Sequence, residues 1–466
     1  MYLRDRIKQD AAFQYVVQSL ELMSPVGQRR LMSQAFCRDA DALQHEWDNL
    51  ERVLPLLRDT AHAQTLVDLR HQLMCLHDIQ GTLAQLREHQ TLTEVDLYEL
   101  KHLAYLTHVM RRDISQMGLE TVVDLPKLGD VFALLDPDNT GIDNFYIYDS
   151  YDPALAPMRK ELRRLQSDDN TGDDAERQQA LCDLLDRHDA IQQQVIARLS
   201  AQLTTHAATL QEALETAGYC DLLLAKAQQA ADWQLCRPQL GDHVALRGLV
   251  HPQLFQQHQS QGLRYQPVDI ALRSGVCLIT GANMAGKTVL LKALGCAQLM
   301  AQYGLFVAAE TATLPLVDDV VSCIGDDQDA LQGLSSFAAE ILRISTNLQR
   351  SRSERLLLLI DEPARTTNPV EGCAIVRSLA TLLNGQAGFA LVTTHYSGLG
   401  VDCQRLRVRG FDETLSQQPI NAQSINQFID YSLVEDHSDT APHEALRIAE
   451  LLGCDTELIQ KAKASL

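Results

Sequence analysis

The stretch Val276-Cys-Leu-Ile-Thr-Gly-Ala-Asn-Met-Ala-Gly-Lys-Thr288 decides the fold of the C-terminal half of the chain. An apolar run of strand length ends at Thr280. Gly281 and Gly286 follow with four residues between them, which is the spacing of a phosphate-binding loop. Glycines at these two positions let successive backbone N–H groups turn inward around a triphosphate.

The residues after the second glycine supply the other groups that this chemistry needs. The Lys287 ammonium can reach the β and γ phosphates, and the Thr288 hydroxyl can take one Mg²⁺ position. Apolar residues then recur from Val289 onward as on the buried side of a helix, whose N-terminus would face the anion. A chance match to so short a pattern is the alternative, and the strand before and the helix after it argue against that alternative.

The overall charge limits the partners of the chain. The formal net charge is −21, from 61 acidic and 40 basic side chains among 466 residues. Such a field repels DNA phosphates unless a local basic patch overrides it. The length predicts two or three domains, and an apolar content of 45% is enough for sizeable cores.

The remaining totals indicate a cytoplasmic protein. The eleven cysteines are scattered singly, which fits reduced thiols in a cytosol. The N-terminus has no signal-peptide pattern, and no apolar run reaches the ~18 residues of a membrane-spanning helix. We therefore expect no contact with a membrane.

The first 235 residues are expected to be helical. Thr93 can cap one helix, and Gly118 suits its C-terminal end. Helix packing within a bundle explains the apolar stripes more simply than a groove for a partner does. One stripe has steps of three and four residues: Leu66, Leu69, Leu73, Leu76, Ile79, Leu83 and Leu86.

The middle of the helical region has a turn, an aromatic run and two helices. Residues 136–141 form a turn signal, and the aromatic run 145–148 is expected to be a packed strand, with base stacking as the alternative. Residues 154–166 look helical, the acidic segment 167–174 breaks the pattern, and a longer helical pattern runs from 181 to 214. We expect an antiparallel pair of helices with an acidic tip and a longer second arm.

The pattern changes near residue 235. Short apolar runs at Val276–Ile279, Leu356–Ile360 and Phe389–Val392 now alternate with helical patterns. Strands separated by helices predict an α/β domain on a largely parallel sheet. The expected domains are therefore a helical domain, 1–235, and an α/β domain, 236–466.

Polar residues follow the second and third of these strands. Asp361 and Glu362 come directly after a buried strand, where parallel sheets bind ligands. Asp361 could orient Mg²⁺ through water, and Glu362 could polarise an attacking water. His395 follows the third strand and could sense a γ-phosphate. Surface acids and a structural histidine remain the alternatives.

A fourth motif is Gly333-Leu-Ser-Ser-Phe-Ala-Ala-Glu340. It is a helix start in which Ser335 can act as the cap. The serine and the helix amides could also bind a γ-phosphate, including one held by another subunit.

These four motifs in this order resemble the MutS family of ATPases, a branch of the ABC-type nucleotide-binding fold. Further similarity covers 248–252, 301–307, 325–333 and, more loosely, 24–31. Residues 433–466 look like the family's C-terminal segment, whose helix-turn-helix supports dimerisation. The resemblance thus implies an ATP-binding and ATP-hydrolysing switch that closes as a homodimer, or as a heterodimer with a related subunit.

The resemblance also assigns roles to residues. It implies that Lys287 and Thr288 bind phosphates and Mg²⁺, Asp361 is the metal carboxylate, Glu362 the general base and His395 the sensor. Ser335 would act across the dimer, and Tyr265 would lie on adenine, although its placement needs a two-residue gap. The remaining loop positions around the nucleotide are Gly281, Ala282, Asn283, Met284, Ala285, Gly286 and Val289.

Several features depart from the family pattern. Ala282 and Ala285 replace the usual Pro and Gly of the loop. Pro363 and Pro369 stiffen the segment after Glu362, where repair members have a Gly-rich loop. A mismatch-reading domain and a DNA clamp are both expected to be missing. Mismatch recognition is therefore doubtful.

The role of the switch has two readings. The family default is duplex DNA, in mismatch repair or damage sensing. Residues 145–151 and 361–369 instead look like a MutS-related subgroup that is associated with reactivating cobalamin-dependent lysine or ornithine aminomutases. In that reading the partner is a client enzyme. A scaffold that does not hydrolyse ATP is a third class, which the presence of Glu362 and His395 disfavours.

Overall fold

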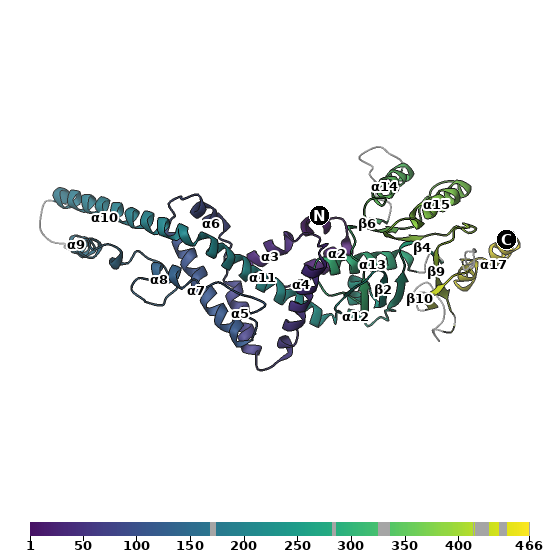
Figure 1. Ribbon diagram of the computed structural model, residues 1–466, viewed down its shortest axis with the longest axis horizontal. Helices are drawn as coiled ribbons and strands as arrows, with labels where there is room; N and C mark the ends of the chain where they lie inside the picture. Colours follow the sequence, from purple (N-terminus) through teal and green to yellow (C-terminus); the bar gives the residue numbers. More distant parts are fainter. Residues whose placement is uncertain are drawn as a thin grey trace. The chain divides into compact units, whose positions relative to one another are not determined.

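The computed structural model describes residues 1–167, 174–281, 286–324, 336–412, 414, 428–437 and 445–465 (Figure 1). The chain forms two compact units. The α/β unit consists of residues 1–20, 34–51 and 229–466, and the helical unit of residues 21–33 and 52–228. The predicted fold class, a helical N-terminal region followed by mixed α/β sheets, is confirmed. The two units interleave in sequence and so do not test a single division at residue 235, which stays a prediction.

The helical unit is built from α-helices joined by short connections. Thr204–His206, a 3₁₀ turn, separates α10 from α11, and α11 continues into the α/β unit. The helices are α3 (Pro25–Met32), α5 (Ala63–Met74), α6 (Gln80–Arg87), α7 (Glu94–Gln116), α8 (Gly129–Leu135), α9 (Leu155–Ser167), α10 (Asp174–Leu203) and α11 (Ala207–Asp232), with further 3₁₀ turns at Leu56–Arg58 and Asp149–Tyr151.

Helix α7 begins and ends where the predicted cap, Thr93, and the predicted C-terminal glycine, Gly118, place it. The Thr93 hydroxyl accepts the Asp96 N–H at 3.2 Å, and the Asp96 carboxylate accepts the Thr93 N–H at 2.9 Å. This capping box satisfies two N–H groups that the helix leaves open. Gly118 follows the C-terminal end with a φ of 68°. The predicted apolar stripe is buried, but a break between α5 and α6 divides it over two helices.

The aromatic run 145–148 is not a strand, so that prediction is wrong. Ile147 and Tyr148 are buried, as a packed segment requires, but the backbone is irregular. A strand needs a partner for its N–H and C=O groups, and every described strand lies in the α/β unit. Tyr148 instead directs its hydroxyl to Asp136 at 2.8 Å.

Helices α9 and α10 form the predicted antiparallel pair and lie side by side (Figure 1). Arg177, near the start of α10, donates to the carbonyl of Leu165, near the end of α9, at 2.9 Å. Arg159, in the first half of α9, donates to His188 further along α10 at 3.4 Å. The second arm is the longer one, with 30 residues against 13. The tip, 168–173, lies outside the described residues.

The α/β unit contains two sheets. A four-stranded sheet has the order β1-β5-β2-β3, and a six-stranded sheet has the order β10-β9-β4-β8-β7-β6. The strands are β1 (Gln239–Leu240), β2 (Val244–Leu249), β3 (Val268–Leu272), β4 (Gly275–Thr280), β5 (Thr311–Leu314), β6 (Asp319–Cys323), β7 (Leu356–Ile360), β8 (Phe389–Thr393), β9 (Gln404–Phe411) and β10 (Ile429–Glu435). The helices are α1 (Leu3–Arg6), α2 (Ala11–Gln18), α4 (Ala40–Val53), α12 (Pro252–Ser260), α13 (Lys287–Gln302), α14 (Ser336–Arg350), α15 (Pro369–Asn384), α16 (Ala445–Leu451) and α17 (Thr456–Ala464).

The six-stranded sheet is parallel except for β10. Its strands β4, β7 and β8 are the three that the apolar runs predict. All five residues of β7 and of β8 are buried, as expected for central strands that are covered on both faces. The expected C-terminal helix-turn-helix corresponds to α16 and α17, with Gly453 between them at a φ of 77°.

Helices cover both faces of this sheet. On one face, Ile344 of α14 and Val376 of α15 join Leu358 of β7 in a single buried cluster. On the other face α13 packs closely, because a Cβ on Gly295 would lie 2.7 Å from a methyl carbon of Leu359. Successive β7 side chains therefore point to opposite helical layers.

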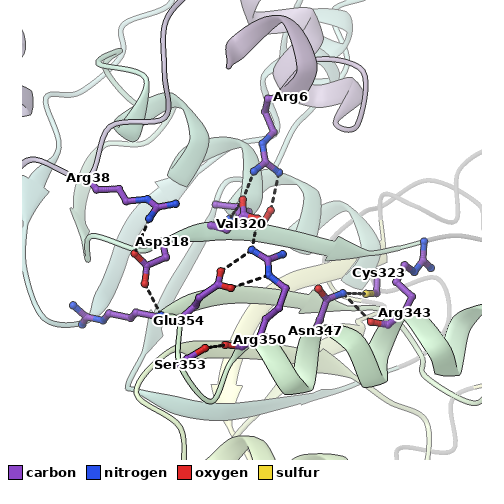
Figure 2. Close-up of polar contacts among 12 residues, drawn as sticks. Arg6, Arg38, Asp318, Val320, Cys323, Arg343, Asn347, Arg350, Ser353 and Glu354 are labelled. Atoms are coloured by element: carbon purple, nitrogen blue, oxygen red, sulfur yellow. Dashed lines mark hydrogen bonds and ion pairs between the residues drawn. The ribbon is translucent and has the colours of Figure 1, made fainter. Parts of the chain in front are cut away.

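A partly buried network of charged side chains links the first helix of the chain to the sheet (Figure 2). Arg6 is 5% exposed and donates to the Val320 carbonyl at 2.8 Å and to the Asp319 carboxylate. Arg350, at the end of α14, donates to the other oxygen of Asp319 at 2.9 Å and to Glu354 at 2.7 Å. The network thus joins α1, β6 and α14.

None of the helices in the described ranges is both long enough and apolar enough to cross a bilayer.

Candidate nucleotide-binding site

Three neighbouring parallel strands bring the candidate residues to one edge of the six-stranded sheet. Strand β8 lies between β4 and β7, with Thr393 opposite Ile279 and Val392 opposite Ile360. The carboxyl ends of the three strands therefore meet at the same edge. Parallel α/β sheets bind their ligands at this edge.

The described part of the phosphate-binding loop has the backbone that the glycines predict. Gly286 has a φ of 71° and precedes the first residue of α13. A Cβ at Gly286 would lie 3.0 Å from the ring of Tyr431, so a side chain there would be both strained and crowded. The loop residues 282–285, predicted to surround the phosphates, lie outside the described residues.

Lys287 begins α13 and is buried in the site. Its ammonium donates to the Gly281 carbonyl at 2.6 Å and lies 3.4 Å from the Glu362 carboxylate. Its exposed fraction is 4%. A buried ammonium is stable only beside acceptors or anions, and the Gly281 carbonyl and the Glu362 carboxylate fill that need here.

Thr288 and Asp361 lie in direct contact. The Thr288 hydroxyl donates to Asp361 Oδ2 at 2.6 Å, and the Thr393 hydroxyl donates to Oδ1 at 2.6 Å. A hydroxyl and a carboxylate at the end of a strand are the hard oxygen donors that Mg²⁺ takes beside nucleotide phosphates. The residues present therefore fit a Mg²⁺ site.

Glu362 follows Asp361 and points to two cations. Its Oε1 lies 3.4 Å from the Lys287 ammonium, and its Oε2 lies 3.6 Å from the Arg365 guanidinium. The side chain is 12% exposed, so water can still reach it. Its backbone has a φ of 44°, in the left-handed region, and its N–H donates to Thr393 Oγ1 at 2.8 Å.

His395 lies two residues beyond the end of β8 and is exposed. Its ring packs against Tyr396, with 4.2 Å between the ring centroids. Its role as a phosphate sensor stays a prediction.

Two tyrosines are candidates for the adenine contact, and the sequence singled out only Tyr265. The Tyr265 hydroxyl accepts the His251 N–H at 2.8 Å, and burial raises the pKa of Tyr265. Tyr431, on β10, approaches Gly286, and its N–H donates to Gln266 at 3.2 Å. No local signal could have identified Tyr431, because it is 145 residues beyond Gly286 in sequence. The role of Tyr265 on adenine stays a prediction.

The segment around Ser335, which is predicted to act across the dimer, is described only from the following helix onward. Ser335 lies outside the described residues, and α14 begins at the next residue. From α14, Glu340 accepts the Ala364 N–H at 3.3 Å. This contact links α14 to the loop that follows Glu362.

Comparison with known proteins finds similarities mainly in the C-terminal part of the chain. Residues 277–466 match the family model for MutS domain V. An endonuclease MutS2 of Thermus thermophilus is 39% identical over 186 residues, which are 40% of this chain and 24% of the relative. A DNA mismatch repair protein MutS of Thermus aquaticus is 32% identical over 205 residues, 44% of this chain and 24% of the relative. An endonuclease MutS2 of Agathobacter rectalis is 30% identical over 277 residues, 58% of this chain and 33% of the relative.

The chain thus spans about a quarter to a third of the length of these relatives. The matched segment begins inside β4 and includes β7 and β8, so it contains the strand ends at which the candidate residues meet. Residues 277–466 thus match the model of MutS domain V, which is an ATPase domain.

Proposed function

We propose that the chain is an ATP-driven molecular switch that hydrolyses ATP to ADP and phosphate. One observation carries the proposal: Lys287, Thr288, Asp361 and Glu362 form a connected set of contacts at the ends of β4 and β7. A phosphate-binding ammonium, two Mg²⁺-type oxygen donors and a carboxylate base are the groups that phosphoryl transfer to water requires.

In the proposed reaction, the Lys287 ammonium binds the β and γ phosphates and offsets the charge that develops on them. Glu362 accepts a proton from the attacking water, whose oxygen forms a bond to the γ phosphorus. The bond from that phosphorus to the bridging oxygen breaks, and ADP leaves with its electron pair. The 3.4 Å between Glu362 and Lys287 supports this division of roles, because base and ammonium then act within one site.

Thr288 and Asp361 are the residues that would hold Mg²⁺. The metal supplies positive charge that stabilises the phosphate oxygens when it is bound. The contact of the Thr288 hydroxyl with Asp361 Oδ2 supports the assignment, since both oxygens can turn to one cation. Tyr265 and Tyr431 are the aromatic side chains proposed to flank adenine. The Tyr431 ring lies beside Gly286 of the loop, and Gln266, which follows Tyr265 in sequence, accepts the Tyr431 N–H at 3.2 Å.

We also propose that two copies of the ATPase domain, or one copy and a related subunit, close over ATP. ATPases of the MutS family generally dimerise. Ser335 would contact the γ-phosphate bound by the partner, His395 would sense it, and residues 433–466 would support the dimer. The helices of region 1–235 would transmit the closure to a client.

A protein client is favoured over duplex DNA. The net charge of −21 opposes binding to phosphates. The basic side chains of α9 are partly neutralised within the helical unit, where Arg159 pairs with Asp149 at 2.5 Å and Arg164 with Glu161 at 2.6 Å. On the resemblance of residues 145–151 and 361–369, the candidate client is a cobalamin-dependent lysine or ornithine aminomutase.

The first test is steady-state hydrolysis of MgATP by the full chain and by Glu362→Gln. The proposal expects turnover by the unsubstituted chain and a loss of ~10²–10³-fold in kcat for the variant. Glu371→Gln, an exposed acid at the start of α15, is the matched control and should turn over normally. Equal turnover by the chain and by Glu362→Gln would show that the base is wrongly assigned.

The second test separates the two partners. Hydrolysis is measured with and without duplex DNA at about 50 and 200 mM salt, since phosphate contacts weaken steeply over this range. A protein client predicts no stimulation by DNA and nucleotide-dependent co-purification of the aminomutase with the chain. Stimulation by DNA that disappears at the higher salt concentration would favour the DNA-binding alternative.

A further inference from the structure

Thr393 ends β8 between the two strands that carry the candidate site, and its side chain is completely buried. Its hydroxyl donates to Asp361 Oδ1 at 2.6 Å and accepts the backbone N–H of Glu362 at 2.8 Å. One hydroxyl therefore contacts the proposed metal carboxylate and the backbone of the proposed base. A valine at this position would have the same shape but could form neither of these hydrogen bonds.

Both oxygens of the Asp361 carboxylate have a hydroxyl partner. Thr288 occupies Oδ2 and Thr393 occupies Oδ1, each at 2.6 Å. Thr393 thus holds Oδ1 from the neighbouring strand, in addition to the contact that Thr288 makes with Oδ2 from the start of α13. With both contacts in place, the Oδ2 atom of Asp361 points toward the Thr288 hydroxyl.

The segment after Asp361 has an uncommon backbone conformation. Glu362 has a φ of 44° and Ala364 a φ of 61°. Residues with a side chain rarely adopt these values, and such residues persist where their surroundings hold them. Side chains bind the backbone at both positions: the Ala364 carbonyl accepts the Tyr396 hydroxyl at 2.9 Å, and the Glu362 N–H donates to Thr393.

We propose that Thr393 is a positioning residue for ATP hydrolysis, because its hydroxyl holds the Asp361 carboxylate and the strained Glu362 backbone in one arrangement. The proposal rests on the function proposed above. Thr393 does not contact the reacting atoms. It acts through Asp361 and Glu362, so its loss should change the rate of hydrolysis more than the binding of ATP.

The experiment compares Thr393→Val, Thr393→Ser and the unsubstituted full chain. Valine removes the hydroxyl and keeps the shape, whereas serine keeps the hydroxyl. The kcat for MgATP, the Kd for ATP and the Mg²⁺ concentration for half-maximal rate are measured for each. Thr107→Val is the matched control, because Thr107 is 1% exposed and its hydroxyl binds only within α7, to the Leu103 carbonyl at 2.7 Å.

The proposal expects Thr393→Val to lose roughly 10–100-fold in kcat, as for other small displacements of reacting groups, while the Kd for ATP stays within about 3-fold. The Mg²⁺ requirement should rise, and Thr393→Ser should keep kcat within about 3-fold. Thr107→Val should match the unsubstituted chain. If Thr393→Val does not fold, Thr393→Ala replaces it with the same expectations.

Three results would overturn the proposal: unchanged kcat in Thr393→Val, an equal loss in Thr393→Ser, or a Kd for ATP that rises as much as kcat falls. Failure of the proposed function has a different signature. In that case the unsubstituted chain does not hydrolyse ATP, or Glu362→Gln does so equally well, and both proposals end. An inert Thr393→Val in a chain whose turnover depends on Glu362 overturns the positioning role alone.

Discussion

Lys101 in the helical unit and Lys287 in the α/β unit are both buried lysines paired with an acid, but their surroundings differ. Lys101 is 0% exposed, and its ammonium donates to Asp136 at 3.3 Å, to the Asn144 carbonyl at 2.8 Å and to the Tyr148 hydroxyl at 2.9 Å. An ammonium has three donors, and here all three have a partner. This lysine is fully used in holding the 136–148 segment to α7.

Lys287 has its partners at the ends of two strands instead. Its ammonium contacts the carbonyl of Gly281 after β4 and the carboxylate of Glu362 after β7. Gly281 belongs to a glycine-rich loop, and Glu362 has a left-handed φ of 44°. A buried charge that is enclosed by one rigid cluster stabilises a fold, whereas a buried charge beside strained backbone at a sheet edge marks a site.

The largest expected effect is on stability, at Lys101. Lys101→Met leaves the Asp136 carboxylate buried without its cation, and removing one partner of a buried pair costs about 3–5 kcal/mol. Urea unfolding measures the loss. Lys160→Met, at an exposed position on α9, is the control and should change the free energy of unfolding by less than about 0.5 kcal/mol. A loss below about 1 kcal/mol for Lys101→Met would contradict the structural role.

The second effect is on activity, at Lys287. Lys287→Met should lower kcat for MgATP by ~10²–10³-fold, since it removes the cation proposed to bind the phosphates. Its free energy of unfolding should change less than that of Lys101→Met, because Arg365 still lies 3.6 Å from Glu362. Lys292→Met, exposed on the same helix, should hydrolyse ATP normally. If Lys287→Met keeps its activity, the contrast between the two lysines fails.

The third prediction concerns how the stability contributed by Asp136 depends on pH. Burial alone would raise the pKa of Asp136, but hydrogen bonds from Thr140, Gly141, Tyr148 and Lys101 outweigh it and hold the pKa well below the ordinary 3.8. Because the folded pKa is the lower one, the ionised carboxylate contributes stability above pH ~4, and this contribution is lost as the pH falls further. Asp136→Asn should therefore be less stable at pH 7, and its stability should fall less between pH 5 and 3. Parallel pH profiles for the two proteins would contradict this.

The smallest effect lies in the network of Figure 2. Arg6→Met should cost about 1–3 kcal/mol, because it leaves the buried Val320 carbonyl without the Arg6 donor and Asp319 with one guanidinium partner, Arg350. Arg38→Met is the matched control, since Arg38 is 59% exposed and its 3.3 Å pair with Asp318 should contribute less than about 1 kcal/mol. Thermal unfolding of the two variants measures the difference, and equal losses would show that burial does not set the strength of these pairs.

The sequence predicted those parts of the fold that local pattern controls. The buried run of β7 and the Thr93 cap of α7 are confirmed because burial and capping act over a few residues. Residues 145–148 were mispredicted because β-propensity says nothing about whether a partner strand exists. Arg6 gave no signal either, since its partners lie 313 and 314 residues away.

The candidate site was predictable to the same extent. Lys287, Thr288, Asp361 and Glu362 stand in short motifs whose spacing reflects their chemistry. Thr393 was missed because a threonine at the end of an apolar run is indistinguishable from an ordinary β-branched strand residue. Its contacts with Asp361 and Glu362 arise only when β8 lies next to β7.

The most direct test of the central claim, that Lys287, Asp361 and Glu362 form one hydrolytic site, is the identity of the nucleotide that Glu362→Gln retains. The variant is incubated with MgATP, passed over a desalting column and denatured, and the bound nucleotide is separated by chromatography. We expect the variant to retain ATP, whereas the unsubstituted chain treated in the same way should yield ADP. If Glu362→Gln retains ADP, or if neither protein retains any nucleotide, Lys287, Asp361 and Glu362 do not form one hydrolytic site.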